Sequence, residues 1–186
     1  MKKTIYLVHG WGGSSSGVEW FNWLKEELYK KGHKVIAFNM PNTENPKIEE
    51  WVRHLEENIK DVDERTYFVG HSIGCQTILR FLEKLHSHKR IGGCVFVAGW
   101  FKVINLESEE LEIAHPWMNS KIEYKRVLDH CNNFLAVFSD NDPLVPLTDS
   151  KIFEEKLGTQ TVIEHDKEHF SGSSGIKELP SLLNAG

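Results

Sequence analysis

A serine set between two glycines is the residue of this chain best suited to nucleophilic chemistry, in the motif Gly-His-Ser-Ile-Gly at residues 70–74. An apolar run precedes the motif and an amphipathic stretch follows it, which is the strand–turn–helix context of a nucleophile elbow. Such a turn strains the backbone of its serine, and glycines two positions to either side avoid the collisions that larger side chains would cause. The N–H groups of the following helix would point to where negative charge develops. We therefore expect Ser72 to be a nucleophile.

A second match to the same pattern is Gly-Ser-Ser-Ser-Gly at residues 13–17, with Ser15 at its centre. This match begins five residues after the first strand candidate, within a run of glycines and serines that is typical of a flexible loop. An elbow has to join its strand to its helix without such slack, so the sequence favours Ser72 over Ser15.

A serine hydroxyl needs a base within hydrogen-bonding reach, and the base needs a third group to orient it. With strands and helices in alternation, we expect these partners on the loops after the last two strands, acid first. The first of those loops contains Asp140 and Asp142, and Pro143 fixes the backbone directly after Asp142. This favours Asp142 as the acid and leaves Asp140 as a turn residue. In the second loop His169 is the expected base, because His165 abuts the strand and fits a structural role.

The oxyanion of a tetrahedral intermediate needs two backbone N–H donors near the serine. Ile73, directly after the serine, is expected to supply one of them. The second should come from the His-Gly-Trp-Gly-Gly turn at residues 9–13, with Trp11 favoured and Gly12 as the alternative. This turn has neither the G-x-G-x-x-G spacing nor the lysine of a phosphate loop, and no acidic residue ends the second strand candidate. We therefore expect no nucleotide cofactor.

The elements that would carry these residues alternate regularly along the chain. Strict alternation predicts an α/β fold with one parallel sheet of about six strands, helices on both faces and right-handed crossovers. In such sheets functional groups gather at the carboxyl ends of the strands. Capping signals precede two helices, Asn-Pro at 45–46 and a Ser120–Glu123 box. The strand candidates are 4–8, 34–38, 65–69, 91–97, 134–138 and 160–164, and the helix candidates are 19–31, 48–59, 73–86, 121–130, 148–157 and 173–184.

The connection at residues 99–120 is longer than a crossover requires. It follows a strand end and carries Trp100, Phe101 and Trp117. Two interpretations stay open: a helical detour whose aromatic side chains pack on the core, or a small cap that walls a substrate pocket with Trp100 and Trp117.

Composition limits the class of protein. With 186 residues, 40% of them apolar and 26% charged, the chain is expected to form a single domain over residues 1–186. A net charge of −5 argues against nucleic-acid binding. Three cysteines, at 75, 94 and 131, fit buried free thiols in a reducing compartment. Only four apolar residues directly precede His9, too few for a signal peptide or a membrane helix, so we expect a cytoplasmic protein without membrane association.

The sequence does not predict a metal site. A His-x-x-x-His pair occurs at residues 165–169, and such a pair can bind a metal when it lies on a helix. Here the pair follows a strand and lacks a partnering cluster of cysteines or histidines. We expect no metal and no other cofactor.

Together, the turn at 9–13, the elbow at 70–74, the Asp-Pro-Leu-Val-Pro loop at 142–146 and His-Phe at 169–170 resemble an α/β-hydrolase. More narrowly, the chain is similar to the small serine-hydrolase family that includes retinoblastoma-binding protein nine and bacterial YdeN-type proteins. The likeness spans nearly the whole chain and also covers Asn-Met-Pro at 39–41 and Pro-Trp at 116–117.

The resemblance implies a compact α/β-hydrolase fold with little or no lid, and a triad of Ser72, Asp142 and His169. In its first loop the chain has His-Gly-Trp at 9–11 where that family has a Pro-Gly-Asn type of sequence. No Leu-x-Cys-x-Glu motif is present, so the protein-binding role in one member's name is not expected to transfer.

The expected activity is that of a carboxylesterase-like serine hydrolase. His169 would take the proton of Ser72 as the serine attacks an ester, thioester or amide carbonyl of a small acyl substrate, and water would then release the acyl group. Two alternatives stay open: a binding or regulatory protein with a vestigial triad, and another reaction of the same serine, such as perhydrolysis or carbon–carbon cleavage. The fold alone does not name the substrate or a protein partner.

Overall fold

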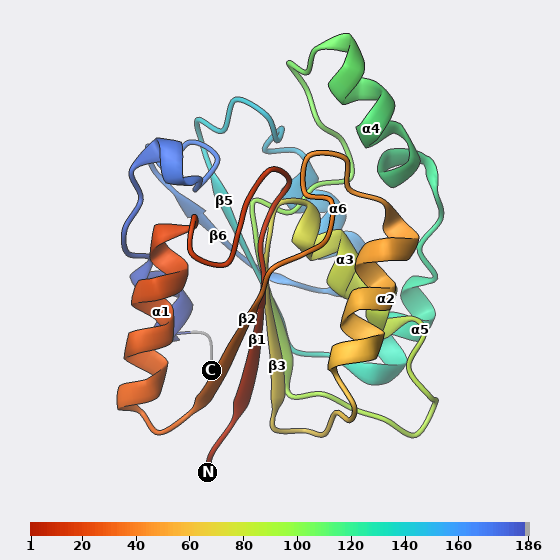
Figure 1. The fold of residues 1–186 in the computed structure, drawn as a ribbon, viewed down its shortest axis with the longest axis vertical. Coiled ribbons are helices and arrows are strands. Elements are labelled where there is room, and N and C mark those ends of the chain that lie inside the picture. Colours follow the sequence, from red (N-terminus) through yellow and green to blue (C-terminus); the bar gives the residue numbers. More distant parts are fainter. Residues whose placement is uncertain (185–186) are drawn as a thin grey trace.

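The computed structural model of the protein describes residues 1–184 and contains one sheet of six strands in the order β2-β1-β3-β4-β5-β6 (Figure 1). Every neighbouring pair is parallel, which confirms the fold class expected from the alternating pattern. The strands are β1 (Thr4–Val8), β2 (Lys34–Phe38), β3 (Thr66–His71), β4 (Gly93–Val97), β5 (Phe134–Ser139) and β6 (Gln160–Glu164).

Helices cover both faces of the sheet, as Figure 1 shows for α1 on one side and α2, α3 and α5 on the other. Along β1, Ile5 and Leu7 pack with the α1 layer, whereas Tyr6 and Val8 pack with the opposite layer, as the two-residue period of a strand requires. The helices are α1 (Glu19–Lys30), α2 (Ile48–Asn58), α3 (Ile73–Leu82), α4 (Ser108–Asn119), α5 (Tyr124–His130) and α6 (Asp149–Leu157).

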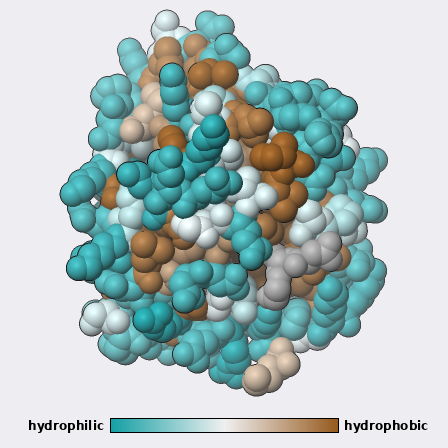
Figure 2. Space-filling model, turned by 180° about the vertical axis from the view of Figure 1, so that it is seen from behind, coloured by the Kyte–Doolittle hydropathy of each residue, from teal (hydrophilic) through white to brown (hydrophobic). Residues whose placement is uncertain are grey.

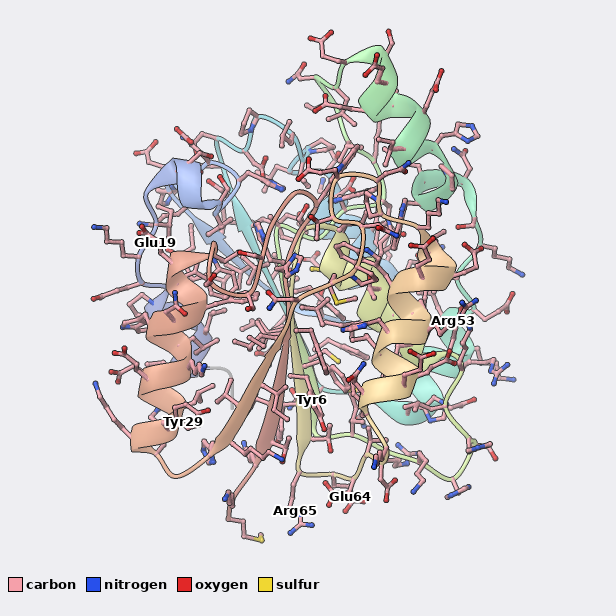
Figure 3. All side chains as sticks on the ribbon, viewed as in Figure 1. Tyr6, Glu19, Tyr29, Arg53, Glu64 and Arg65 are labelled. Atoms are coloured by element: carbon pink, nitrogen blue, oxygen red, sulfur yellow. The ribbon has the colours of Figure 1, made fainter. Side chains whose placement is uncertain are left out.

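Aromatic side chains form much of the layer between the sheet and α2 and α3. Tyr6, which Figure 3 labels, points into this layer. Its ring lies between two phenylalanine rings, with centroids 5.6 Å from Phe38 and 5.4 Å from Phe68. Charged side chains such as Arg53 on α2 extend outward in the same view. From behind, the surface is mostly hydrophilic, with apolar residues in separate patches (Figure 2). Burial of the apolar layers is thus the main stabilising term of this fold.

The chain after β6 does not form the predicted helix over 173–184. It forms two 3₁₀ turns, Gly172–Ser174 and Pro180–Asn184. Gly175 ends the first turn with a φ of 67°, and Pro180 has no N–H for an intrahelical bond. Leu179 and Leu182 of this segment are nevertheless buried in the apolar layer on the α1 side of the sheet.

Both capping signals were also assigned wrongly. Helix α2 begins at Ile48 with Lys47 in the N-cap position, so the Asn-Pro pair at 45–46 lies outside it. Ser120 ends α4, where its hydroxyl donates to the carbonyl of Pro116 at 2.6 Å. The capping box belongs instead to the start of α4, between Glu107 and Glu110.

The long connection at 99–120 carries α4, which lies beyond the carboxyl ends of the strands (Figure 1). Buried charged side chains anchor it at both ends. At its start, the Asp149 carboxylate accepts two backbone N–H groups, at 2.6 and 3.0 Å. At its end, the buried guanidinium of Arg80 donates to the backbone carbonyls of Trp117, Ser120 and Lys121.

The three cysteines are buried free thiols, as expected. Among residues 1–184, no helix has the length and apolar character needed to cross a bilayer.

Candidate active site

The elbow joins β3 to α3 without any intervening loop. Ser72 has a φ of 54°, a conformation that strains a residue with a side chain. A Cβ atom on Gly74 would lie 2.4 Å from the carbonyl oxygen of Val8, and one on Gly70 would lie 2.8 Å from the backbone nitrogen of Cys75. Glycine at both positions therefore lets α3 pack against β1 and β3, and this packing imposes the strained conformation on Ser72.

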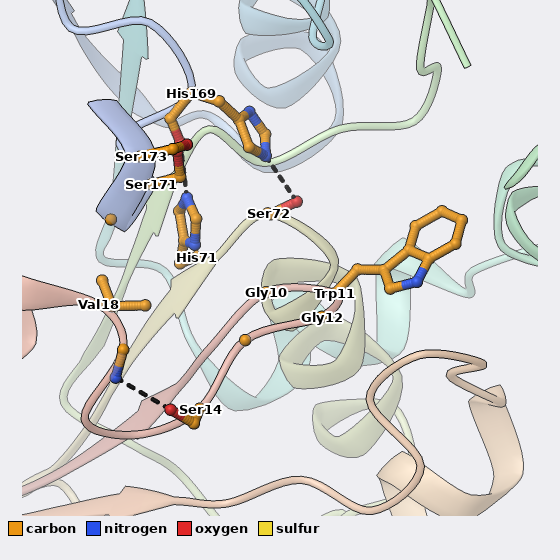
Figure 4. A pocket seen from close by; sticks show the side chains of 13 residues that line it. Gly10, Trp11, Gly12, Ser14, Val18, His71, Ser72, His169, Ser171 and Ser173 are labelled. Carbon is orange, nitrogen blue, oxygen red and sulfur yellow. Dashed lines mark hydrogen bonds between the residues drawn. The ribbon is translucent and has the colours of Figure 1, made fainter. Parts of the chain in front are cut away.

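The three side chains expected to cooperate lie in one hydrogen-bonded row. His169 Nε2 is 3.0 Å from Ser72 Oγ, and His169 Nδ1 is 2.8 Å from Asp142 Oδ2 (Figure 4 draws the first bond). The Asp142 side chain is only 3% exposed, and its other oxygen accepts the backbone N–H groups of Leu144 and Val145. The carboxylate is thereby held in place and kept from water, so it can orient the imidazole.

The alternative acid and base pair with each other, away from Ser72. His165 Nδ1 lies 2.5 Å from Asp140 Oδ2, and the His165 side chain is 82% exposed. Their hydrogen bond raises the pKa of His165 and lowers the pKa of Asp140. Ser15 lies in the loop between β1 and α1, where its backbone N–H donates to Asn39 Oδ1 at 2.9 Å.

The loop that carries His169 is strained and needs external support. Asp166, Glu168 and Phe170 all have positive φ values, of 54°, 47° and 54°. Four consecutive side chains provide that support, from Ser139 at the end of β5 to Asp142, one for each residue from Asp166 to His169. Ser139 Oγ binds the Lys167 N–H, Asp140 Oδ1 the Asp166 N–H, Asn141 Oδ1 the Glu168 N–H, and Asp142 the His169 ring.

We expect Asn141→Ala to lower kcat by roughly 10- to 100-fold with little change in KM, because His169 would lose part of the support that holds it near Ser72. Asn141 Oδ1 accepts bonds from the Ser139 hydroxyl and the Glu168 N–H, both at 2.8 Å. Asn141→Asp keeps an acceptor at this position and should restore most of the rate. Steady-state kinetics on one ester substrate would measure both variants. Equal kcat values for the wild type and Asn141→Ala would contradict the prediction.

His71 is a supporting residue that the sequence analysis missed. Its Nε2 lies 2.7 Å from the carbonyl oxygen of His169, and since a carbonyl only accepts, Nε2 carries the proton. Burial lowers the pKa of His71 to about 3, so the ring stays neutral near pH 7. The carbonyl of the following residue, Phe170, accepts a hydrogen bond from the indole N–H of Trp20 at 2.9 Å. The sequence shows a histidine directly before the elbow serine. It does not show that this histidine supports His169, because the two residues are 98 positions apart.

The backbone around Ser72 distinguishes the candidate oxyanion donors. The Gly12 N–H donates to the carbonyl of Thr43 at 2.9 Å and is therefore engaged. Ile73 is the first residue of α3, a position without an intrahelical acceptor. Within residues 1–184, the Trp11 N–H donates to no backbone carbonyl. The structure thus argues against Gly12, and Trp11 and Ile73 stay the predicted oxyanion donors.

Two clefts meet at Ser72. The first, of about 310 Å³, runs between the loop at 10–18 and the turn at 171–173, and is lined mainly by glycines and serines (Figure 4). The second, of about 380 Å³, extends under the connection at 99–120. Its apolar walls are Trp11, Trp100, Val103, Leu106 and Leu144, and it also contains Glu44 and Glu110.

Only one of the two candidate pocket tryptophans of the long connection lies beside the serine. Trp100 lines the second cleft, and its indole Nε1 lies 3.2 Å from Ser72 Oγ. Trp117 lies elsewhere, packed edge-on against Trp51 with its indole donating to the carbonyl of Pro46 at 3.0 Å. The structure therefore brings Trp100, but not Trp117, to the candidate site.

The strand order, the all-parallel sheet and a serine on a strand–helix elbow are those of the α/β-hydrolase class. The crystal structure of the ydeN gene product from Bacillus subtilis is similar over 98% of this chain and 95% of its own, with a TM-score of 0.89 and 29% identity. Polyneuridine aldehyde esterase shares the fold at a TM-score of 0.66, with 18% identity over 98% of this chain and 96% of its own.

The sequence comparisons narrow the class to a family. The chain belongs to the serine hydrolase family, whose model matches residues 5–185. YdeN of Bacillus subtilis strain 168, a hydrolase by name, is 31% identical over 184 residues, covering 99% of this chain and 94% of YdeN. The serine hydrolase RBBP9 of Rattus norvegicus is 21% identical over 187 residues, covering 97% of this chain and 95% of its own. The protein is accordingly an enzyme, a hydrolase.

Proposed function

We propose that the protein hydrolyses small ester, thioester or amide substrates by two-step acyl transfer, with Ser72 as nucleophile, His169 as general base and Asp142 as the orienting acid. The observation that supports this most strongly is the row of hydrogen bonds from Asp142 through His169 to Ser72 Oγ. It ends on a strained elbow where two clefts meet, which is where a bound carbonyl could be attacked.

In the first step the Ser72 proton moves to His169 Nε2 while Oγ bonds to the carbonyl carbon. The N–H groups of Trp11 and Ile73 stabilise the oxyanion. His169 then gives the proton to the leaving oxygen, sulfur or nitrogen as its bond to carbon breaks. In the second step water loses a proton to His169 and attacks the acyl-enzyme. The carbon–Oγ bond breaks, Oγ regains a proton from His169, and the acid is released.

Small substrates fit the clefts best. Volumes of about 310 and 380 Å³ are near the lower end of the range typical of ligand pockets. The connection at 99–120 contributes Val103, Leu106 and Glu110 to the second cleft. Because Asp149 and Arg80 anchor its two ends, we assign it the role of a fixed cap that walls the site, rather than a lid that swings open.

Labelling with a fluorophosphonate probe tests this function directly, because the probe reacts with activated serines. We expect intact-mass analysis to show one adduct on the native protein, and peptide mapping to place it on Ser72. Ser15→Ala should be labelled at the wild-type rate, and heat-unfolded protein should not be labelled. A folded wild type that gains no adduct would contradict the proposal and favour a binding protein built on this scaffold.

A further inference from the structure

The contact between Trp100 and Ser72 determines how the protons of the site are arranged. An indole N–H can donate a hydrogen bond but cannot accept one. Across the 3.2 Å contact, Ser72 Oγ is therefore the acceptor and Trp100 Nε1 the donor. The serine's own proton is left to point at His169 Nε2, 3.0 Å away. Trp100 thus does more than wall the second cleft.

The hydrogen bond between His169 and Asp142, at the other end of the row, also has a fixed direction. An ionised Asp142 carboxylate can only accept, so the proton between Asp142 and His169 sits on Nδ1. His169 Nε2 is then unprotonated and can receive the Ser72 proton. All the bonds from Trp100 to Asp142 consequently run in one direction, the arrangement required before attack.

The chain after β4 is shaped to bring the indole to this position. Ala98 has a φ of 46°, an uncommon conformation for a residue other than glycine. The following Gly99 packs so closely that a Cβ atom would lie 2.6 Å from Phe153 Cζ and 3.1 Å from Cys75 Cβ. This turn lies against α3 one residue before Trp100, which is itself only 1% exposed.

Helix α3 also holds the backbone of Trp100. Gln76 is fully buried, and its Nε2 donates to the Trp100 carbonyl at 2.9 Å. The guanidinium of Arg80 in turn donates to Gln76 Oε1 at 3.2 Å. Gln76 and Arg80 follow Ser72 by about one and two helical turns, so one helix positions both the serine and the tryptophan.

We propose that Trp100 is a catalytic residue whose indole N–H stabilises negative charge on Ser72 Oγ; this rests on the proposed function. During acylation Oγ bonds to the carbonyl carbon while its proton passes to His169. During deacylation the carbon–Oγ bond breaks and its electron pair returns to Oγ, which then takes a proton from His169. Trp100 keeps its proton throughout and donates to Oγ in both steps. The four tetrahedral positions around Oγ accommodate this arrangement: two covalent bonds, to Cβ and to the carbonyl carbon, and two hydrogen bonds, with His169 and with the Trp100 N–H.

The experiment compares Trp100→Phe with the wild type and with Trp51→Phe as the matched control. Trp51 is also a fully buried tryptophan, and its indole donates to the carbonyl of Pro41 at 2.8 Å. We expect Trp100→Phe to lower kcat and the rate of fluorophosphonate labelling by roughly 10- to 100-fold. The factor in kcat should be the same for p-nitrophenyl esters from acetate to hexanoate, with KM little changed. Trp51→Phe should stay near the wild-type rate.

Because phenylalanine also leaves space behind, a second variant replaces Trp100 with 3-benzothienylalanine, which keeps the two-ring shape but has sulfur in place of N–H. We expect the same fall in kcat for this variant, and thermal melts would show that it is folded. Wild-type kcat in the benzothienyl variant, or a loss that appears only in KM and depends on acyl length, would overturn the inference and leave Trp100 as a wall. A wild type that neither hydrolyses esters nor becomes labelled would instead refute the proposed function itself.

Discussion

Ser72→Ala is expected to abolish ester hydrolysis, with a fall in kcat of about 10⁶-fold. Alanine has no atom that can bond to the carbonyl carbon, so neither acylation nor an acyl-enzyme is possible. Any residual rate would come from water activated by His169 and from the oxyanion donors. The measurement is kcat on p-nitrophenyl butyrate, with a long incubation at high enzyme concentration to detect the variant.

The control for this variant is Ser15→Ala, which removes the other serine of a G-x-S-x-G match. It should retain wild-type kcat, because Ser15 lies in the loop before α1 and has no histidine partner in the described structure. Thermal melts of both variants would show that they are folded. Full activity in Ser72→Ala would refute the proposed nucleophile, and loss of activity in Ser15→Ala would show that its loop matters for the reaction.

The parts of the site that could be predicted are those dictated by local geometry. An elbow needs glycines at 70 and 74 because backbone atoms approach within 3 Å of where their Cβ atoms would be. That requirement is visible in the sequence itself. Alternating strands and helices likewise imply that the loops after β5 and β6 meet at the sheet edge where the elbow lies, so the sequence alone predicts that Asp142 and His169 lie near Ser72.

The supporting contacts could not be predicted, because they join residues far apart in the chain. Trp100 and Ser72 are separated by 28 residues, and Asn141 and Glu168 by 27. Trp100 follows a positive φ at Ala98, which that residue type does not suggest, and Trp117 is placed by contacts with Pro46 and Trp51, which lie far away in the chain. The predicted helix over 173–184 contains Gly175 and Pro180, two residue types that disfavour the interior of an α-helix, and the structure has two 3₁₀ turns there instead.

Asp142→Asn is expected to lower kcat by about 10⁴-fold. An amide no longer requires a proton on His169 Nδ1, and it can donate to Nδ1 instead, which places the ring proton on Nε2. Asp140→Asn is the matched control, because Asp140 bonds to His165 at the surface and should change kcat by no more than a few-fold. Comparable losses in the two variants would mean that the acid has been assigned wrongly.

The same variant also tests the direction of the hydrogen bonds around the serine. With the proton of His169 on Nε2, both the imidazole and the Trp100 indole would donate to Ser72 Oγ, so the serine's own proton would have no acceptor in the row. Fluorophosphonate labelling of Asp142→Asn should therefore fall together with ester hydrolysis, although Ser72 and the oxyanion donors are unchanged. If labelling persisted at the wild-type rate while hydrolysis was lost, Asp142 would act only after Ser72 has been activated.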